Sequence, residues 1–328
     1  MSPNMNLTTM NETIESSSCV DATATKIGQT IALSLILPVS LVGNSLVVLI
    51  VYKTPTLRKP INYFIANMAI SDLLYPIFWQ PWFLSSLHAK SWLIGGQLGQ
   101  ALCKFVSFSG SVSTVVSTQN LILIAVDRFG AVVFPLRSPL IRSKLCPFFI
   151  LATWIVAMAV NSPDLFTFEL LQENSGEIYC TERWEKAFGE SSSSTDFTVA
   201  SYIVFIYLPV MLLAILYSII FIKLKTQVHP GEQFANNQQQ RKRRNRNVLQ
   251  MSIAIVVVFV ICWLPFTTYV LMGRYSASSM HFSCGFLIYG KVSNVMVHAY
   301  CAINPLICFL FSSHYRQALQ RLIKCSGG

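Results

Sequence analysis

Cys103 to Phe134 reads CKFVSFSGSVSTVVSTQNLILIAVDRFGAVVF, and this stretch decides how the rest of the chain is organised. It is apolar or small along nearly its whole length, with a cysteine at one end and an Asp-Arg pair near the other. As an α-helix it would run about 47 Å, which exceeds the roughly 30 Å hydrocarbon core of a bilayer. The stretch therefore predicts a tilted helix that crosses a membrane and protrudes from it.

The composition of the whole chain supports a membrane protein. Of the 328 residues, 53% are hydrophobic and only 12% are charged, whereas a soluble domain carries about 25% charged residues. Apolar stretches of spanning length recur without a soluble block between them. They cover 27–52, 61–87, 101–134, 145–168, 197–224, 248–272 and 285–311. We predict an all-α membrane protein, a single seven-transmembrane helix bundle.

A short amphipathic segment follows the seventh stretch. Ser312 to Lys324 sets apolar residues against basic ones, a pattern typical of a helix on the membrane surface. Cys325 beside it is a palmitoylation candidate, the alternative being an unmodified thiol. The chain thus divides into an N-terminal tail (1–26), the bundle (27–311), and a surface helix with a short tail (312–328).

The basic residues predict the orientation. Seventeen of the 24 Lys and Arg residues fall on the side that holds the C-terminus, so this side is cytoplasmic and the N-terminus is outside. Eleven of the 14 acidic residues fall on the outer side. The outer tail carries two glycosylation triplets, at Asn6 and Asn11. The Arg-rich run 241–246 then extends the sixth helix towards lipid headgroups or a protein partner, and no nucleic acid is implied.

Four cysteines fall on the outer side. Cys103 and Cys180 face an oxidising compartment, where we expect them to pair and to hold the long loop after the fourth helix over the bundle. Cys19 and Cys284 lie on the same side. They form either a second bridge or two unpaired thiols.

Asp72 stands in the middle of the second stretch. An ionisable group at that depth costs roughly several kcal/mol unless it is paired or hydrated. Asn44, Ser117 and Asn304 stand at similar depth in other stretches, so we expect them around Asp72. They form either an ion site or a hydrogen-bond cluster that holds no ion.

Motifs in all seven stretches resemble the rhodopsin-like, or class A, G protein-coupled receptors. They occur in the order and with the spacing of that family. They are Gly43-Asn44, Ala69 to Asp72, Cys103 with Asp127-Arg128-Phe129, Trp154, Pro209 with Tyr217, Cys262 to Phe266, and Asn304 to Cys308. None of these motifs is specific alone, but the ordered set is.

The resemblance implies a plasma-membrane receptor rather than an enzyme. A ligand outside and a heterotrimeric G protein inside would favour the same helix packing, so each raises the affinity of the other. Arrestin and a receptor kinase are further implied partners. No cofactor is implied apart from a sodium ion at Asp72.

The resemblance also assigns an activation switch. Trp263 beside Pro265 would form the floor of the ligand cavity, and Asp127 would hold Arg128 in the resting state. The complete switch comprises Asp127, Arg128, Tyr217, Trp263, Pro265, Asn304 and Pro305.

Four residues depart from the family pattern. Phe129 replaces the tyrosine of the Asp-Arg-Tyr triplet, and Cys308 replaces the tyrosine of the Asn-Pro-x-x-Tyr motif. The second change removes the hydroxyl expected to meet the tyrosine of the fifth helix. Tyr300 stands where the family offers an asparagine to sodium, and Asn245 stands where some members clasp the arginine with an acid.

Sequence features favour a peptide ligand. Gly110 stands where an amine receptor would carry an aspartate, and His298 where an opsin would carry its retinal lysine. The loop from Tyr179 to Trp184 resembles that of the neuropeptide FF, orexin and neuropeptide Y-like receptors for amidated peptides. The acidic outer face would steer a cationic peptide towards Glu182 or Glu185. The alternative is a small-molecule or lipid ligand.

The predicted ligand-binding residues lie in the outer half of the bundle. They are Trp82, Thr114, Glu182, Trp184, Phe266, Tyr269, Asn294 and His298. Other protein classes fit less well. A transporter would tend to show repeated halves, and none is seen in the sequence. An enzyme would need a convergent catalytic or metal site, whereas the five histidines are scattered among loops and helices.

We predict appreciable signalling without agonist, because Asn245 lacks the carboxylate that would hold Arg128 at rest. Transfected cells should show more G protein activation than cells that carry empty vector. Agonist-free activation equal to that of the empty cells, at confirmed surface expression, would refute this.

Overall fold

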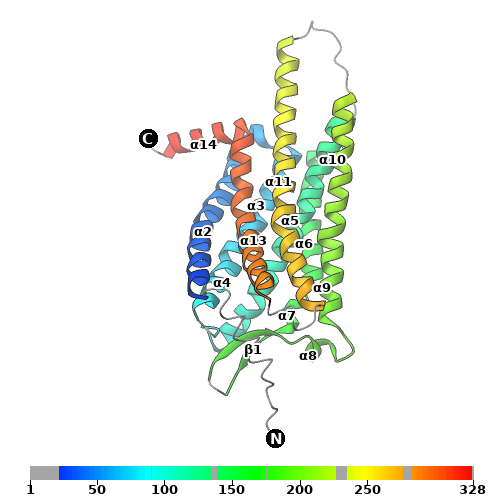
Figure 1. Ribbon diagram of the computed structural model, residues 1–328. Coiled ribbons are helices and arrows are strands. Elements are labelled where there is room, and N and C mark those ends of the chain that lie inside the picture. Colours follow the sequence, from blue (N-terminus) through cyan, green and yellow to red (C-terminus); the bar gives the residue numbers. More distant parts are fainter. Residues whose placement is uncertain are drawn as a thin grey trace.

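The computed structural model describes residues 22–89, 91–134, 139–174, 176–226, 235–275 and 283–326. Long helices run side by side and form an elongated bundle (Figure 1). A β-hairpin covers one end of the bundle, and the last helix lies at the other (Figure 1). We call these the hairpin end and the α14 end. The predicted seven-helix bundle with a short helix after it is confirmed.

The crossing helices follow the predicted stretches closely. In chain order they are α2 (Ala22–Lys53), the run of α3 (Pro60–Leu74), η2 (Tyr75–Trp79) and α4 (Gln80–His88), α5 (Gly96–Val133), α6 (Cys146–Asn161) with α7 (Asp164–Thr167), the run of α9 (Ser194–Tyr202), η4 (Ile203–Tyr207) and α10 (Leu208–Thr226), α11 (Ala235–Tyr275) and α13 (Cys284–Phe311). Within the described residues, six of these segments are long and apolar enough to cross a membrane. The run from α3 to α4 supplies the remaining crossing, although η2 divides it into shorter helices.

Two π-helical turns interrupt the crossings beside prolines. Pro76 lies within η2, and Pro209 directly follows the first residue of α10. A proline has no N–H to donate and its ring collides with the carbonyl four residues earlier, so the hydrogen-bond ladder shifts. The N–H of Gln80 accordingly reaches back five residues to the carbonyl of Tyr75.

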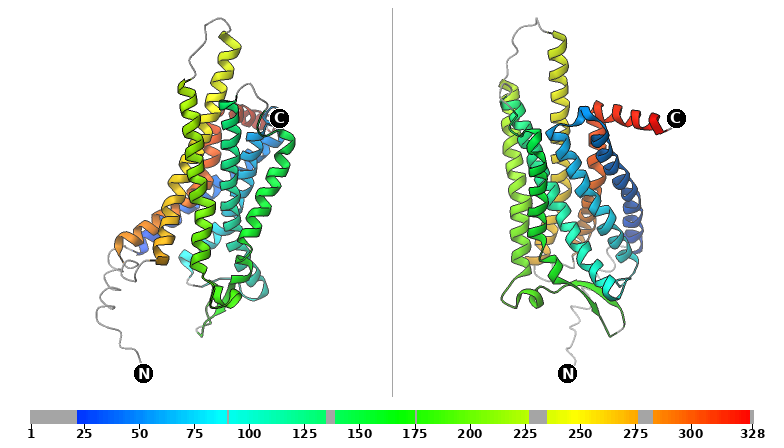
Figure 2. Two further views of the ribbon diagram at one scale, coloured as in Figure 1. Left: turned by 90° about the vertical axis from the view of Figure 1, so that its right-hand side faces the viewer. Right: turned by 180° about the vertical axis from the view of Figure 1, so that it is seen from behind.

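The helix α11 extends beyond the rest of the bundle at the α14 end (Figure 2). It begins at Ala235, well before the apolar stretch predicted from residue 248. The added part is polar and rich in Gln, Arg and Lys, which are good helix formers. The Arg-rich run therefore continues the sixth crossing as a helix.

The hairpin was not predicted from the sequence. Its strands β1 (Phe168–Gln172) and β2 (Ile178–Glu182) pair antiparallel. Gly176 has φ +84°, a backbone conformation that favours glycine in this tight connection. The expected disulfide is present, because Cys103 of α5 is bonded to Cys180 of β2 with a Cα–Cα distance of 5.6 Å. An isolated two-stranded hairpin is marginally stable in water, so this bond to a long helix gives it an anchor.

Of the two cysteines of the second expected disulfide, only one lies among the described residues. Cys284, at the start of α13, is disulfide-bonded. Its expected partner Cys19 lies outside the described residues, as do the glycosylation candidates Asn6 and Asn11. The Cys19–Cys284 pairing and both glycosylation sites stay predictions.

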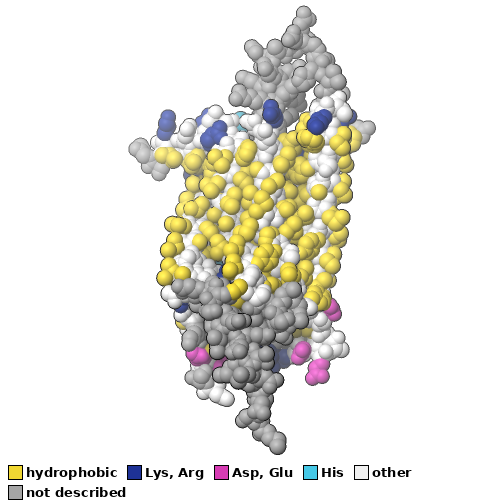
Figure 3. Space-filling view, in the orientation of Figure 1, with side chains coloured by type: hydrophobic (Ala, Val, Ile, Leu, Met, Phe, Trp, Pro, Cys, Tyr) yellow, Lys and Arg dark blue, Asp and Glu magenta, His cyan; other side chains and the backbone are white. Residues whose placement is uncertain are grey.

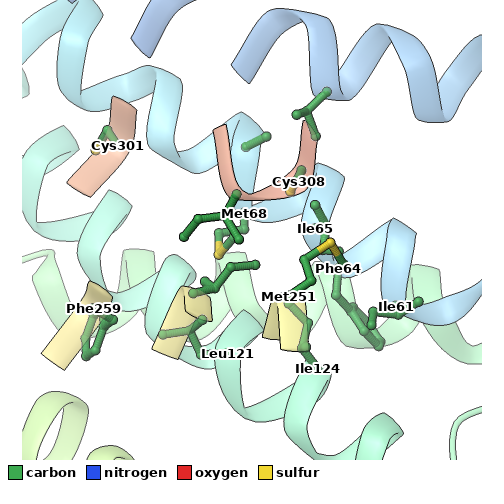
Figure 4. Packing of buried hydrophobic residues seen from close by; sticks show 14 of the residues in the cluster. Ile61, Phe64, Ile65, Met68, Leu121, Ile124, Met251, Phe259, Cys301 and Cys308 are labelled. Atoms are coloured by element: carbon green, nitrogen blue, oxygen red, sulfur yellow. The ribbon is translucent and has the colours of Figure 1, made fainter. Parts of the chain in front are cut away.

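The main apolar core lies between α3, α5, α11 and α13 (Figure 4). Met68, Leu121 and Met251 come from three of these helices, and each is at most 1% exposed. The outward faces are equally apolar, with Leu310 72% exposed and Phe148 67% exposed. Such a surface suits contact with lipid chains, and it forms a continuous hydrophobic band in Figure 3.

Short helices complete the fold. They are η1 (Pro55–Leu57), η3 (Ser143–Leu145), α8 (Trp184–Phe188) and α14 (Ser313–Ser326). Tyr315 of α14 is buried against the bundle and donates a hydrogen bond to Asn62 Oδ1 at 3.3 Å. Arg316 and Arg321 on the same helix are exposed. This confirms an amphipathic helix, which runs across the bundle axis (Figure 2). Cys325, the palmitoylation candidate, lies near its end.

Charged side chains gather at opposite ends of the hydrophobic band. On the face shown in Figure 3, Lys and Arg side chains line the α14 end and a few also appear toward the hairpin end, whereas the Asp and Glu side chains lie at the hairpin end. The unequal distribution predicted from the sequence is therefore seen on the folded surface.

Candidate functional site

A polar cluster occupies the middle of the bundle, around Asp72. The carboxylate accepts hydrogen bonds from Ser117 Oγ at 2.5 Å and from Asn304 Nδ2 at 2.8 Å. Ser71 Oγ lies 2.9 Å from Ser117 Oγ. The second, third and seventh crossings thus meet at one acid. This arrangement satisfies the strong demand for partners that a buried carboxylate carries.

Asn44 lies outside this cluster, contrary to the sequence expectation. Its amide donates to the carbonyl of Cys301 at 2.8 Å and to that of Ser40 at 2.9 Å. Next to it, a Cβ added at Gly43 would come within 2.7 Å of the Pro305 ring. The Gly43-Asn44 pair therefore serves close packing of α2 against α13, where the proline leaves a carbonyl to be satisfied.

A second polar node was missed by the sequence analysis. Asn67 Nδ2 donates to Asn120 Oδ1 at 3.1 Å and to Thr153 Oγ1 at 3.3 Å, and Trp154 Nε1 donates to Asn67 Oδ1 at 2.9 Å. One side chain thereby joins α3, α5 and α6. An asparagine in an apolar stretch is a signal for such a node, but its partners are far away in the chain.

Aromatic rings connect the polar cluster to the hairpin end. Tyr300 is 1% exposed and its ring centroid lies 5.6 Å from that of Phe259 and 6.4 Å from that of Trp263. The Tyr300 hydroxyl donates to Met68 Sδ at 3.8 Å. Tyr300 thus lies beside Trp263, in the layer between the acid and the cavity described below.

At the α14 end, Arg128 forms an ion pair with Asp127, with its Nε 3.1 Å from Asp127 Oδ2. The side chains are 14% and 9% exposed. This is the arrangement that the resemblance assigns to the resting state. Tyr217 packs against the main core, and Cys308 is buried. The side chain of Asn245 is outside the described part of the chain.

A cavity of about 310 Å³ lies at the hairpin end, between the second to sixth crossings and the hairpin. Its floor includes Trp263, as expected. Aromatic side chains dominate the lining, with small polar groups between them. The lining residues are Tyr75, Trp79, Ser107, Gly110, Ser111, Thr114, Val115, Val160, Asn161, Asp164, Phe168, Glu182, Phe197, Thr198, Ser201, Tyr202, Phe205, Ile206, Trp263, Phe266, Val270 and Arg274.

The structure brings part of the predicted ligand-binding set to this cavity. Thr114, Glu182 and Phe266 line it. Trp82 and Trp184 do not line the cavity, and each packs at a tilt against a ring that does. The ring centroid of Trp82 is 4.7 Å from that of Trp79, and the centroid of Trp184 is 4.9 Å from that of Phe197.

The predicted residues closest to α13 do not line the cavity. Tyr269 packs against Phe286, with ring centroids 4.8 Å apart. His298 is fully buried between the rings of Tyr75 and Phe83, at 5.0 and 5.2 Å. Asn294 keeps a buried carbonyl oxygen without a hydrogen-bond partner among the described residues. Rings from the second crossing thus separate α13 from the cavity.

Gly110 has a specific packing role. A Cβ added there would lie 3.1 Å from the indole of Trp79. The space that an aspartate would need at this position is therefore occupied by an aromatic ring, which fits the absence of an amine-receptor acid.

Three charged side chains reach the cavity, and only one of them had been assigned to it. Glu182 pairs with Arg274, whose Nη2 is 3.5 Å from Glu182 Oε2. Ser194 bridges both, since its Oγ donates to Glu182 Oε1 at 2.9 Å and accepts from Arg274 Nη1 at 2.9 Å. The third is Asp164 of α7, which lies close to Ser111. The sequence signalled Asp164 only as one of many outer acids.

The family of 7 transmembrane receptors (rhodopsin family) matches residues 43–307, which is most of the chain. The chain belongs to this family. It is accordingly a multi-pass membrane receptor, and the predicted class A resemblance is confirmed.

Relatives of this receptor bear the names of peptide receptors. The RYamide receptor of Drosophila melanogaster is 29% identical over 291 residues, covering 87% of this chain and 60% of the relative. The allatostatin-A receptor of Bombyx mori is 28% identical over 88% of this chain and 77% of the relative. The human neuropeptide Y receptor type 2 is 29% identical over 88% of this chain and 74% of the relative. The receptor thus spans between three fifths and about three quarters of their lengths.

Asn67→Ala should lower the unfolding temperature of the purified receptor by several degrees. The buried Asn120 and Thr153 and the half-buried Trp154 each lose a hydrogen bond, and the loss at a buried group costs about 1–3 kcal/mol. Thermal unfolding in detergent measures the effect. Gln317→Ala, on the exposed side of α14, is the control and should leave the temperature unchanged. Equal unfolding temperatures for the two variants would contradict the stabilising role of the polar node at Asn67.

Proposed function

We propose that this receptor binds an amidated, cationic peptide at the hairpin end and activates a heterotrimeric G protein at the α14 end. The observation that carries the proposal is the aromatic cavity beneath the disulfide-anchored hairpin, in a chain whose relatives are named RYamide, allatostatin-A and neuropeptide Y receptors. The relatives' names give no support to the small-molecule or lipid alternative.

The charges support an extracellular hairpin end and a plasma-membrane location. Basic side chains gather at the α14 end and acidic ones at the hairpin end (Figure 3), as the positive-inside rule requires for a cytoplasmic α14 end. On this orientation, the disulfide lies in the oxidising compartment. A positively charged peptide would be attracted to the mouth of the cavity by the acidic rim.

The lining suits a peptide that ends in aromatic and basic residues. Rings such as Trp79, Phe197 and Phe266 offer faces for stacking, while Thr114 and Ser107 offer hydroxyl groups to amides. Binding pockets of this kind combine a mostly apolar wall with a few placed polar groups. An amidated C-terminus removes a negative charge that would be repelled by the acids of this cavity.

The route inward runs through side chains that already touch one another. A ligand that presses on Trp263 would reach the ring of Tyr300, and beyond it lies the cluster of Asp72 and Asn304. Pro265 and Pro305 weaken the helix ladders on either side of this path. Release of Arg128 from Asp127 would then expose a cation to the G protein. Arrestin and a receptor kinase would use the same opened end.

We also propose that a sodium ion binds at Asp72. The Oδ1 atom of Asn304 is buried without a hydrogen-bond partner among the described residues, beside the carboxylate and Ser117. Carboxylate, hydroxyl and amide oxygens are the ligands that hard cations prefer. Tyr300 contributes a ring where the family offers an amide, so the site has fewer oxygens and would be weak.

Replacing sodium by choline in the assay buffer should raise agonist affinity about fivefold, at the low end of allosteric coupling, because a cation that favours the resting packing opposes the agonist. Asp72→Asn should abolish this dependence. Radioligand displacement at matched ionic strength measures it. Equal affinity in both buffers for the unmodified receptor would contradict the sodium site.

The function itself is tested by G protein activation in transfected cells, challenged with a library of amidated peptides rich in Arg, Phe and Trp. We expect a saturable response that is lost in Arg128→Ala. Arg142→Ala is the matched control, because Arg142 lies exposed near the same end and outside the switch. Silence across the library at confirmed surface expression would contradict the proposal.

A further inference from the structure

We infer that Asp164 is the residue that selects a guanidinium group of the ligand, and that Glu182 is not. The inference rests on the proposed function, since it concerns the same cavity and a cationic peptide. The sequence pointed to Glu182 or Glu185 as partner of the ligand cation, and the arrangement of charges in the cavity points elsewhere.

Both carboxylate oxygens of Glu182 already have a partner within the chain. One carboxylate oxygen faces Arg274 Nη2 at 3.5 Å, and the other accepts from Ser194 Oγ at 2.9 Å. Arg274 is in turn held by Ser194 at 2.9 Å. A ligand cation would have to displace an arginine from this triad. The exchange of one guanidinium for another yields little net binding energy.

Asp164 is the remaining charge of the cavity. Among the described residues, no Lys or Arg nitrogen lies within 4.0 Å of its carboxylate, because the ion pairs found there join other residues. Its side chain is only partly exposed, and the side chain close to it is that of the neutral Ser111. With Glu182 and Arg274 cancelling, the cavity carries a net charge of −1, at Asp164. A partly desolvated carboxylate that lacks a counter-ion gains most from an incoming cation.

The surroundings of Asp164 favour a planar guanidinium over an ammonium. Asn161 and Ser111 place further oxygen atoms in the lining, which suit the five N–H donors of a guanidinium. Phe168 and Phe197 also line the cavity, and aromatic faces stack on this flat cation. An ammonium would use the charge of Asp164 and leave the rings without a stacking partner.

The test compares an amidated peptide that ends in Arg-Phe with the same peptide carrying citrulline, which has the shape of arginine without its charge. In the unmodified receptor the arginine peptide should be about 10- to 100-fold more potent. Asp164→Asn should remove this difference by weakening the arginine peptide alone. Asp196→Asn is the matched control, because it removes the same charge from an exposed acid that does not line the cavity.

Each outcome decides the inference. Equal potency losses in Asp164→Asn and Asp196→Asn would show long-range steering only and would overturn it. A preference for arginine over citrulline that persists in Asp164→Asn would also overturn it, while leaving the proposed function intact. No response to either peptide in the unmodified receptor would overturn the proposed function together with the inference.

A second variant covers the case in which Asp164→Asn fails to reach the cell surface. Asp164→Glu keeps the charge and moves it one methylene further into the cavity. It should therefore favour a peptide whose arginine is shortened by one methylene, whereas the unmodified receptor should favour arginine. An unchanged order of potency in Asp164→Glu would contradict direct pairing.

Discussion

The burial of Asp72 is the constraint on which the rest of the bundle depends. Lipid chains provide no hydrogen-bond donors for a carboxylate. The interior of the bundle must therefore supply these donors, and they come from more than one helix. Ser117 and Asn304 do so, and their positions bring the second, third and seventh crossings into register. The same requirement recurs at Asn67, which ties three helices, and at Asn44, which satisfies a carbonyl of α13. Because moving from lipid to a helix interface gives apolar side chains no hydrophobic gain, these few polar contacts help to specify the packing that the surrounding apolar residues then fill.

The hairpin end is organised by a different balance, between two charges that neutralise each other and a third that has no counter-ion among the described residues. The disulfide holds β2 against α5, and this places Glu182 where Arg274 of α11 and Ser194 of α9 can reach it. The hairpin, the fifth crossing and the sixth crossing are thereby connected at their outer ends. Asp164 stands apart from this set and faces the cavity. A structural ion pair and a free acid within one cavity give the two carboxylates separate tasks.

Much of the bundle was predictable because membrane helices can be recognised in a sequence as long apolar runs. The motifs around Asp72, Arg128 and Trp263 could also be recognised, because each lies within one short stretch of the chain. The prolines likewise signalled interruptions, although not the π-helical form that they take. The hairpin was missed because its strands are short, and their pairing depends on a distant disulfide. The cavity lining was only partly anticipated: His298 was expected in it, but the rings of Tyr75 and Phe83 pack against this side chain instead. The ion pair of Glu182 with Arg274 was not foreseen, because the two residues lie 92 positions apart in the chain.

The length of α11 has a mechanical consequence. The helix runs unbroken from Ala235 to Tyr275 with Pro265 near its outer end, directly beyond Trp263 at the cavity floor. From Pro265 to Ala235 the helix measures about 45 Å. A tilt of about 10° at the proline would therefore sweep the far tip through about 8 Å. The two arms on either side of Pro265 are unequal in length, so a tilt that moves Trp263 only slightly at the cavity moves the tip at the α14 end much further.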